Sequence, residues 1–160
     1  VCGVVWCDVM GFDCVVFVRF MLIYPAADRP VLHVSMLNTD NAAGQILYGQ
    51  ALAKLRDEGV LIIGSGRSYH NLRQFYHQPL VTNPESVAFD EWLTDAATDT
   101  DGRNDKLAQW LNVPTARAVH PTSEHLLPMM IAAGAATGDQ GEQIYSDILL
   151  GKAGSDYRVC

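Results

Sequence analysis

The run Val60-Leu-Ile-Ile-Gly-Ser-Gly66 joins four apolar residues, three of them β-branched, to a turn with two glycines. Such a run predicts a short strand of a sheet, followed by a sharp change of direction. In α/β proteins, residues that follow a strand end often form the functional site. We therefore expect chemistry in the segment after this strand.

The residues before this run predict a first strand and a helix. Residues 31–37, entered through Pro30, are rich in β-branched and apolar types, which favours a buried strand of a parallel or mixed sheet. Residues 38–40 offer N-cap side chains, and Gly59 suits the end of the helix that they begin. The apolar positions of that helix are Ile46, Leu47, Leu52 and Leu55.

The residues after the run predict further helices. Short helical patterns cover 89–97 and 106–111, separated by a polar loop at 99–102, and we expect both to be surface helices. A last helix over 126–136 has Thr122 or Ser123 as its cap, and Pro128 should make its first turns irregular. The predicted fold is α/β, with a mixed or mostly parallel sheet flanked by helices, in a single domain over residues 1–160.

Composition excludes some classes of partner. Eleven basic against eighteen acidic residues give a net charge of −7, so nucleic acid and anionic membranes are unlikely partners. The longest apolar stretch, 14–24, contains Arg19 and is too short to span a membrane. The four cysteines form no C-x-x-C pair, which favours a reducing, cytoplasmic location. The chain begins at Val1 with an apolar run, and we expect a truncated product.

The five histidines differ in their settings. His33 lies within the first strand and His77 follows two aromatic residues, so each has an ordinary structural interpretation. His70 follows the glycine turn, where an imidazole can bind a metal or transfer a proton near neutral pH. No phosphate-binding glycine motif is present.

The segment His120-Pro-Thr-Ser-Glu-His125 places two imidazoles and a carboxylate at the start of the last helix. Zn²⁺ and Fe²⁺ sites use these ligand types. However, the two histidines are five residues apart across a proline, whereas H-E-x-x-H places them four apart on one helical face. By spacing alone, a metal role and plain capping with a surface histidine both stay open.

Taken in order, several segments resemble the class III extradiol ring-cleavage dioxygenases of the LigB-type superfamily, in particular the 4,5-DOPA dioxygenase-like members. They cover nearly the whole chain. These segments are Gly11-Phe-Asp-Cys14, Tyr24-Pro-Ala-Ala-Asp-Arg-Pro30, Gly64-Ser-Gly66 with His70-Asn-Leu72, His120-Pro-Thr-Ser-Glu-His-Leu-Leu-Pro128 and Gly134-Ala-Ala136.

The resemblance implies a non-haem Fe²⁺ site, or a Zn²⁺ site in some members, that binds a small aromatic diol such as DOPA together with O₂. His125 then corresponds to a metal ligand, and His70 to a ligand or to the catalytic acid/base. Glu124 and His120 would bind the metal, bind substrate or orient the ligands, and Asn71 would hold His70 in place. A homo-oligomer is compatible with this assignment.

Two departures from the family pattern change the expectation. The family's Gly-His-Gly and Ser-Ala-His-Trp stretches, each with a metal-binding histidine, do not occur in this sequence. Cys14 replaces a family histidine at a catalytic position, and a thiol is a poor substitute in proton transfer near pH 7. We therefore expect the carboxy-terminal portion of a catalytic domain, incomplete relative to the family fold and impaired as an enzyme. The alternatives are a non-catalytic degenerate subunit that binds a partner and an unrelated α/β binding domain.

Overall fold

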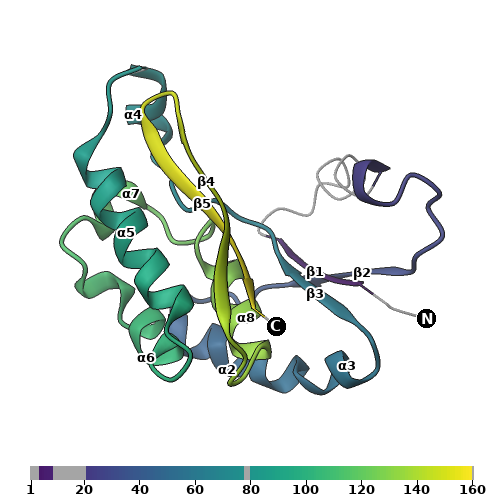
Figure 1. Cartoon of the computed structure of the whole chain (residues 1–160). Coiled ribbons are helices and arrows are strands. Elements are labelled where there is room, and N and C mark those ends of the chain that lie inside the picture. The colour runs from purple at the N-terminus through teal and green to yellow at the C-terminus, as the bar shows by residue number, and fades with distance from the viewer. Residues whose placement is uncertain (1–3, 9–20, 78–79, 160) are drawn as a thin grey trace.

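The computed structural model describes residues 4–8, 21–77 and 80–159, with side chains from residue 21 onward. Three short strands form a parallel sheet, namely β1 (Val4–Asp8), β2 (Val31–Ser35) and β3 (Leu61–Gly64). Their order is β2-β1-β3, and β1 pairs in parallel with both neighbours. The helices labelled in Figure 1 and a second, antiparallel pair of strands gather to one side of this sheet, whereas the helical residues 21–23 lie apart from them.

The connection from β2 to β3 contains two helices, α2 (Ala42–Leu52) and α3 (Lys54–Asp57). The sequence predicted one helix through Leu55, and the structure interrupts it at Ala53, which ends α2 and begins α3. Gly59 has a φ of +79°, as expected of the residue that ends this helical region. The predicted strands at 31–37 and 60–63 are confirmed as β2 and β3 to within two residues at either end.

The prediction that the first strand is buried was wrong. Leu32 is 65% exposed, and His33 is exposed as well. β2 lies at the edge of the sheet with β1 as its partner, so one of its long sides has no neighbouring strand within the described sheet.

The second half of the chain is mainly helical. Its elements are α4 (Leu72–His77), α5 (Pro84–Thr98), α6 (Arg103–Ala108), the 3₁₀ helix η1 (Trp110–Asn112), α7 (Ala116–Val119) and α8 (Leu127–Ala135). The helix expected at 106–111 is divided at Gln109 into the end of α6 and η1. η1 ends before Val113, which is extended, a conformation that the following Pro114 favours. No helix in the described part of the chain is long and apolar enough to cross a membrane.

The main core lies between α5, α8 and the segment from α6 to α7. Phe89 and Leu93 of α5, Trp110 of η1 and Met130 of α8 are almost fully buried and belong to one cluster. On the other side of α8, Ile131 packs against residues of α2, β2 and β3. Since α5 contributes its inner face to the core, it is not simply a surface helix. α8 thus lies between the sheet and the helical half.

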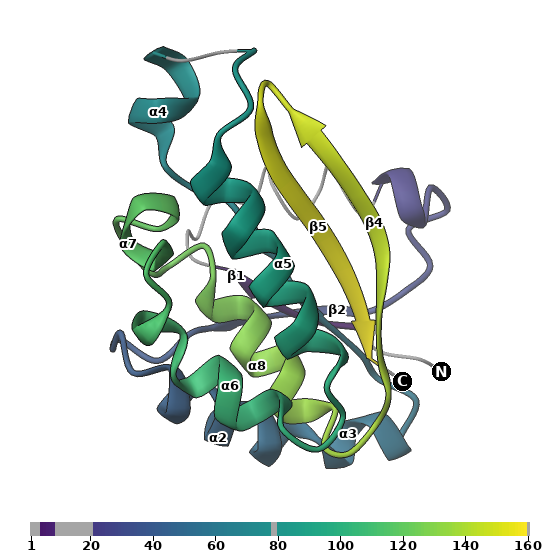
Figure 2. The ribbon, with the colours of Figure 1, turned by 60° about the vertical axis from the view of Figure 1, so that its left-hand side comes forward.

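A hairpin of two strands, β4 (Gly141–Leu149) and β5 (Lys152–Val159), follows α8 and was not predicted. Figure 2 shows it lying along α5. Leu150 and Gly151 form its turn, with φ of +50° and +75°. Two successive positive φ values are typical of a type I′ turn, whose twist matches that of the strands. The observed fold therefore belongs to the predicted α/β class, with an additional antiparallel pair.

Candidate metal centre

The segment after β3 carries His70 and is fixed by backbone hydrogen bonds to residues 119 and 125, much further along the chain. The amide of Arg67 donates to the His125 carbonyl over 2.8 Å, and the amide of His70 donates to the Val119 carbonyl over 3.2 Å. The Asn71 side-chain amide donates to the Ala118 carbonyl over 2.7 Å. Asn71 thus anchors the residues next to His70 to the chain at Ala118.

The glycine turn allows this segment to approach His125 closely. A Cβ atom placed on Gly66 would lie 2.1 Å from the carbonyl oxygen of His125, closer than any side chain permits. Only glycine fits at position 66, because the two backbones approach each other too closely for a side chain.

The second segment, 120–126, is ordered by its own side chains. The Thr122 hydroxyl donates to Glu124 over 2.6 Å, and the Ser123 hydroxyl donates to the carboxylate of Asp40. The carbonyl of Ser123 accepts from the amides of Leu126 and Leu127. The prediction that Thr122 or Ser123 caps the last helix was wrong, because α8 has Leu126 as its N-cap and no side-chain cap. Pro128 lies in the first turn, where a missing amide donor costs nothing, so it need not distort the helix.

Three residues from these two segments converge. Potential ligand atoms of His70, Glu124 and His125 all lie within 4.8 Å of one another, and all three side chains are partly buried. The two imidazole rings are 3.5 Å apart between centroids and tilted by 32°. We call these three residues the metal-ligand cluster. In the described ranges it is the one group of three or more such side chains close enough to hold an ion.

The electrostatic state of the cluster favours a cation. Burial lowers the pKa of His70, and the neighbouring His125 and Arg67 lower it further, against the opposing effect of Glu124. Burial acts to raise the pKa of Glu124, but its hydrogen bonds with Thr122 and the backbone, together with the two histidines, leave that pKa below its usual value. At neutral pH, His70 is therefore a neutral base and Glu124 an anion, the states in which both bind metals.

His120 lies behind the cluster and is fully buried. Its Nε2 is 3.0 Å from the carbonyl oxygen of Ser68, and its ring packs against Phe89 and the edge of Trp110. Nδ1 has no hydrogen-bond partner within the described part of the chain. Burial lowers the pKa of His120 to about 4, although the Ser68 carbonyl partly opposes this. The buried ring supports the backbone of the segment that carries His70.

The other candidate residues lie elsewhere. Cys14 falls outside the described residues, His33 is on the exposed edge strand β2, and His77 is the last residue of α4. Sequence reasoning missed Asp40, which is 83 residues from its partner Ser123. An acidic residue in a polar loop gave no signal that it would contact the metal-ligand segment.

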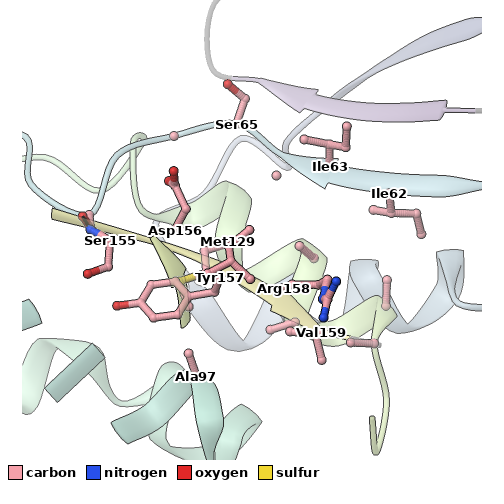
Figure 3. Close-up of a pocket in the computed structure, with 18 of the residues that line it drawn as sticks. Ile62, Ile63, Ser65, Ala97, Met129, Ser155, Asp156, Tyr157, Arg158 and Val159 are labelled. Atoms are coloured by element: carbon pink, nitrogen blue, oxygen red, sulfur yellow. Dashed lines mark hydrogen bonds between the residues drawn. The ribbon is translucent and has the colours of Figure 1, made fainter. Parts of the chain in front are cut away.

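A cavity of about 660 Å³ has one member of the cluster, His125, in its wall. Its other walls come from β3, the inner side of α8 and β5, as Figure 3 shows for Ile62, Met129 and Tyr157. Small-molecule sites in proteins commonly fall in the range of 300–1,000 Å³. The β4–β5 hairpin, which the sequence did not reveal, therefore supplies one wall of the space next to His125.

The donor set fits a divalent transition metal. Two imidazoles and one carboxylate are the ligands of many non-haem Fe²⁺ oxygenases, and catalytic Zn²⁺ sites use the same types with an open position. His70, Glu124 and His125 provide one such set at mutual distances that one ion can span.

Comparison with known proteins agrees with this chemistry. The family model described as the catalytic LigB subunit of aromatic ring-opening dioxygenase matches residues 5–152. Dioxygenase tasH of Hapsidospora irregularis is 35% identical over 153 residues, which cover 88% of this chain and 47% of that protein. The 4,5-DOPA dioxygenase extradiol of Beta vulgaris is 38% identical over 127 residues, covering 79% and 47%.

A solved structure gives the same result for the fold. An uncharacterized protein from Escherichia coli superposes with a TM-score of 0.80 at 28% identity, covering 93% of this chain and 62% of that one. The chain spans about half the length of the curated relatives that it matches. With a family model that matches almost the whole chain and relatives above 30% identity, the chain belongs to the LigB family of aromatic ring-opening dioxygenases.

Proposed function

We propose that residues 1–160 form one domain that carries part of the active site of a metal-dependent extradiol dioxygenase acting on catechol-type substrates such as DOPA. The observation that carries this proposal is the convergence of His70, Glu124 and His125, whose ligand atoms lie within 4.8 Å of one another. The printed names of the relatives, 4,5-DOPA dioxygenase extradiol among them, support an aromatic diol as the substrate class.

In this proposal, His125 and Glu124 hold Fe²⁺ or Zn²⁺, and His70 is either the third ligand or the catalytic acid/base. Such an ion, when bound, would supply the Lewis-acid and redox chemistry by which both atoms of O₂ are inserted beside the diol of a catecholate. The donor set favours Fe²⁺ for this chemistry. Asn71 and Gly66 keep the two ligand-bearing segments together.

The chain's own residues would also handle a proton. A catechol must lose protons to bind as a catecholate, and a neutral imidazole beside it can accept one. His70 meets this requirement because burial and the neighbouring His125 hold its pKa below the ordinary value. A protonated imidazole cannot bind a metal, so His70 cannot be a metal ligand and the proton acceptor at the same time. Replacing His70 should therefore give different results for these two roles.

The cavity next to His125 supports an aromatic substrate. Ile62, Met129 and Tyr157 offer apolar surface to a ring, and Ser65 and Ser155 are also among the residues that line the space (Figure 3). Its volume of about 660 Å³ exceeds that of one catechol, and it therefore accommodates a substituted ring.

The decisive experiment measures metal binding by this chain before activity. We expect Fe²⁺, or Co²⁺ as its coloured substitute, to bind the chain under anaerobic conditions with one ion per chain. His125→Ala should weaken binding by about 100-fold or more because a ligand is lost. His33→Ala is the matched control, since His33 is an exposed histidine on β2. Equal affinity of wild type and His125→Ala would remove the metal claim.

A second measurement separates the two roles of His70. If His70 is a ligand, His70→Ala weakens Co²⁺ binding as His125→Ala does. If it is the acid/base, His70→Ala leaves the affinity unchanged and lowers the rate at which L-DOPA is converted to its yellow ring-opened product. Oxygen uptake measured with L-DOPA and the Fe²⁺-loaded chain tests activity directly.

A further inference from the structure

The loop before α2, residues 37–40, is fixed to that helix by one buried side chain. Gln45 is fully buried, and its Nε2 donates to the carbonyls of Leu37 and Thr39 over 2.9 and 3.2 Å. Its Oε1 accepts from the amide of Leu37 over 3.2 Å. Three hydrogen bonds to one buried amide leave this loop little freedom relative to α2.

The helix α8, which begins directly after the metal-ligand segment, is also held against α2. Cβ atoms placed on Gly49 and Gly134 would lie 2.0 Å from the Ile131 carbonyl oxygen and 2.1 Å from that of Ile46. The backbones of the two helices therefore touch, which only glycine allows at these two positions. Such contact fixes the distance between the helices.

Ser123 links the 37–40 loop to the start of α8. It is 2% exposed, its hydroxyl donates to the carboxylate of Asp40, and its carbonyl accepts from the amides that begin α8. Glu124 and His125 follow it directly. The metal-ligand segment is thus held to α2 on one side through Asp40 and the 37–40 loop, and on the other through α8.

Given the proposed function, we propose that Asp40 is a positioning residue for the metal ligands Glu124 and His125. Its carboxylate holds the Ser123 hydroxyl, which fixes the backbone that carries both ligands before a metal binds. Hydrogen bonds beyond the ligands typically affect metal affinity by 10–100-fold. Asp40 is itself exposed and belongs to a different segment from all three members of the cluster.

The chemistry of this contact allows a rescue test. Asn at position 40 keeps a carbonyl oxygen that accepts the Ser123 hydroxyl, whereas Ala removes the acceptor. We expect Asp40→Ala and Ser123→Ala each to weaken Co²⁺ binding by roughly 10-fold or more, and Asp40→Asn to stay within about 3-fold of wild type. The double variant should bind no more weakly than either single one, because one contact is lost in all three.

The visible spectrum of bound Co²⁺ distinguishes positioning from loss of structure. Asp40→Ala should change the intensity of the Co²⁺ bands, which report coordination geometry, while circular dichroism and the folding cooperativity stay as in wild type. Asp57→Ala is the matched control, since Asp57 is an exposed aspartate on α3. Wild-type affinity and spectrum in Asp40→Ala would overturn the proposal.

Amide hydrogen exchange decides the matter without any metal. The amides of Leu126 and Leu127 donate to the carbonyl of Ser123. Asp40→Ala should increase their exchange rates by roughly 10-fold while the amides of α5 exchange as before, and Asp40→Asn should restore protection. Unchanged exchange rates in Asp40→Ala would overturn the positioning role of Asp40. Failure of the wild-type chain to bind metal is a separate result, and it would contradict only the proposed function.

Discussion

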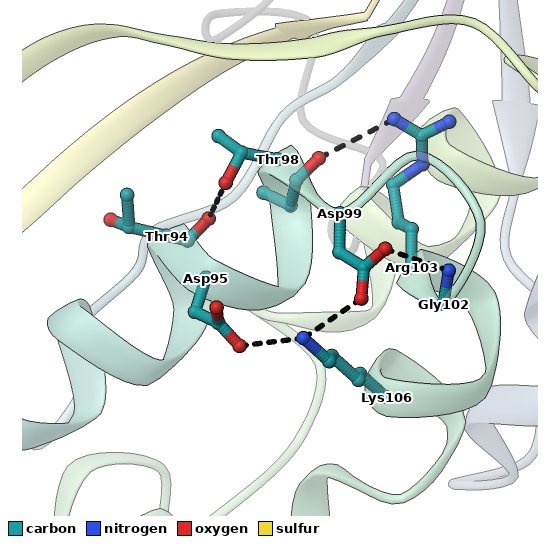
Figure 4. Close-up of polar contacts among 8 residues, drawn as sticks. Thr94, Asp95, Thr98, Asp99, Gly102, Arg103 and Lys106 are labelled. Atoms are coloured by element: carbon teal, nitrogen blue, oxygen red, sulfur yellow. Dashed lines mark hydrogen bonds and ion pairs between the residues drawn. The ribbon is translucent and has the colours of Figure 1, made fainter.

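Two polar clusters in this protein differ in how their charges are balanced. The metal-ligand cluster consists of two imidazoles and one carboxylate, all partly buried. The second cluster, the α5–α6 ion cluster, consists of Asp95, Asp99 and Lys106 (Figure 4). There the Lys106 ammonium lies 2.7 Å from Asp95 and 2.9 Å from Asp99, with side chains 34–69% exposed.

The difference shows which kind of polar cluster indicates a site. The α5–α6 ion cluster carries its own cation. Hydrogen bonds from Lys106 and Gly102 lower the pKa of Asp99, and those with Asp95 and Asp99 raise the pKa of Lys106. The metal-ligand cluster gathers lone-pair donors and holds His70 neutral instead. Only the metal-ligand cluster gains by binding an ion from solution.

The largest expected effect on stability concerns the buried base behind the metal-ligand cluster. His120 has a pKa of about 4 in the folded chain and about 6.5 when unfolded. The unfolded state therefore binds the proton more readily, and stability falls as the pH drops from about 6.5 to about 4, by about 3 kcal/mol. Urea unfolding at several pH values measures this loss.

The matched variants isolate the contribution of that ring. Gln at position 120 can still donate to the Ser68 carbonyl but does not titrate, so the loss between pH 6.5 and 4 should be smaller in His120→Gln by about the same 3 kcal/mol. His33→Gln, at an exposed histidine, should keep the full loss. Identical pH profiles for wild type and His120→Gln would contradict the assignment.

The next effect tests whether the metal-ligand cluster gains by binding an ion. A metal that binds only the folded chain stabilises it by about 2.7 kcal/mol at 100 times its Kd, a rise in Tm of roughly 5–10 °C. Calorimetry with Zn²⁺ should show this rise, and EDTA should reverse it. Glu124→Gln should show a smaller rise, because an amide is a weaker ligand than a carboxylate. An equal rise in both proteins would exclude Glu124 as a ligand.

A smaller effect concerns the close approach that brings the cluster together. Gly66→Ala places a Cβ 2.1 Å from the His125 carbonyl oxygen, so the two segments must separate, at a cost of about 2 kcal/mol. Metal affinity should fall with stability, because His70 and His125 move apart. Gly138→Ala is the control, since a Cβ there has no neighbour within 4 Å. Equal stability of the two variants in urea would contradict this account.

Part of the fold and of the candidate site could be predicted from the sequence. The strand that ends at Gly64 and the helix end at Gly59 follow from short segments of sequence. The joint placement of His70 and His125, which are far apart along the chain, followed only from the family resemblance. A strand end, a glycine turn and a histidine lie within eleven residues, so the chain itself keeps them close. Sequence reasoning succeeds where the determining residues are neighbours along the chain.

The rest depends on contacts between distant residues. Ser123 was expected to cap a helix, but its hydroxyl bonds to Asp40, and no local pattern distinguishes these outcomes. The β4–β5 hairpin was missed because its turn, Leu150-Gly151, lacks the usual Asn-Gly signal. Its first strand is also largely exposed on both faces, so it shows no clear alternation of polar and apolar residues.

The smallest expected effect is in the α5–α6 ion cluster. Lys106→Met keeps the aliphatic stem and removes both ion pairs, and exposed pairs contribute little, so Tm should fall by about 2 °C or less. The difference from wild type should vanish in 1 M salt, which screens exposed charges. The variant should also bind Co²⁺ no better than wild type, because two well-hydrated carboxylates do not replace a partly buried set of imidazoles. Co²⁺ binding by Lys106→Met at this cluster would show that removal of the internal cation is enough to create a metal site. The type of ligand would then not explain the difference between the two clusters.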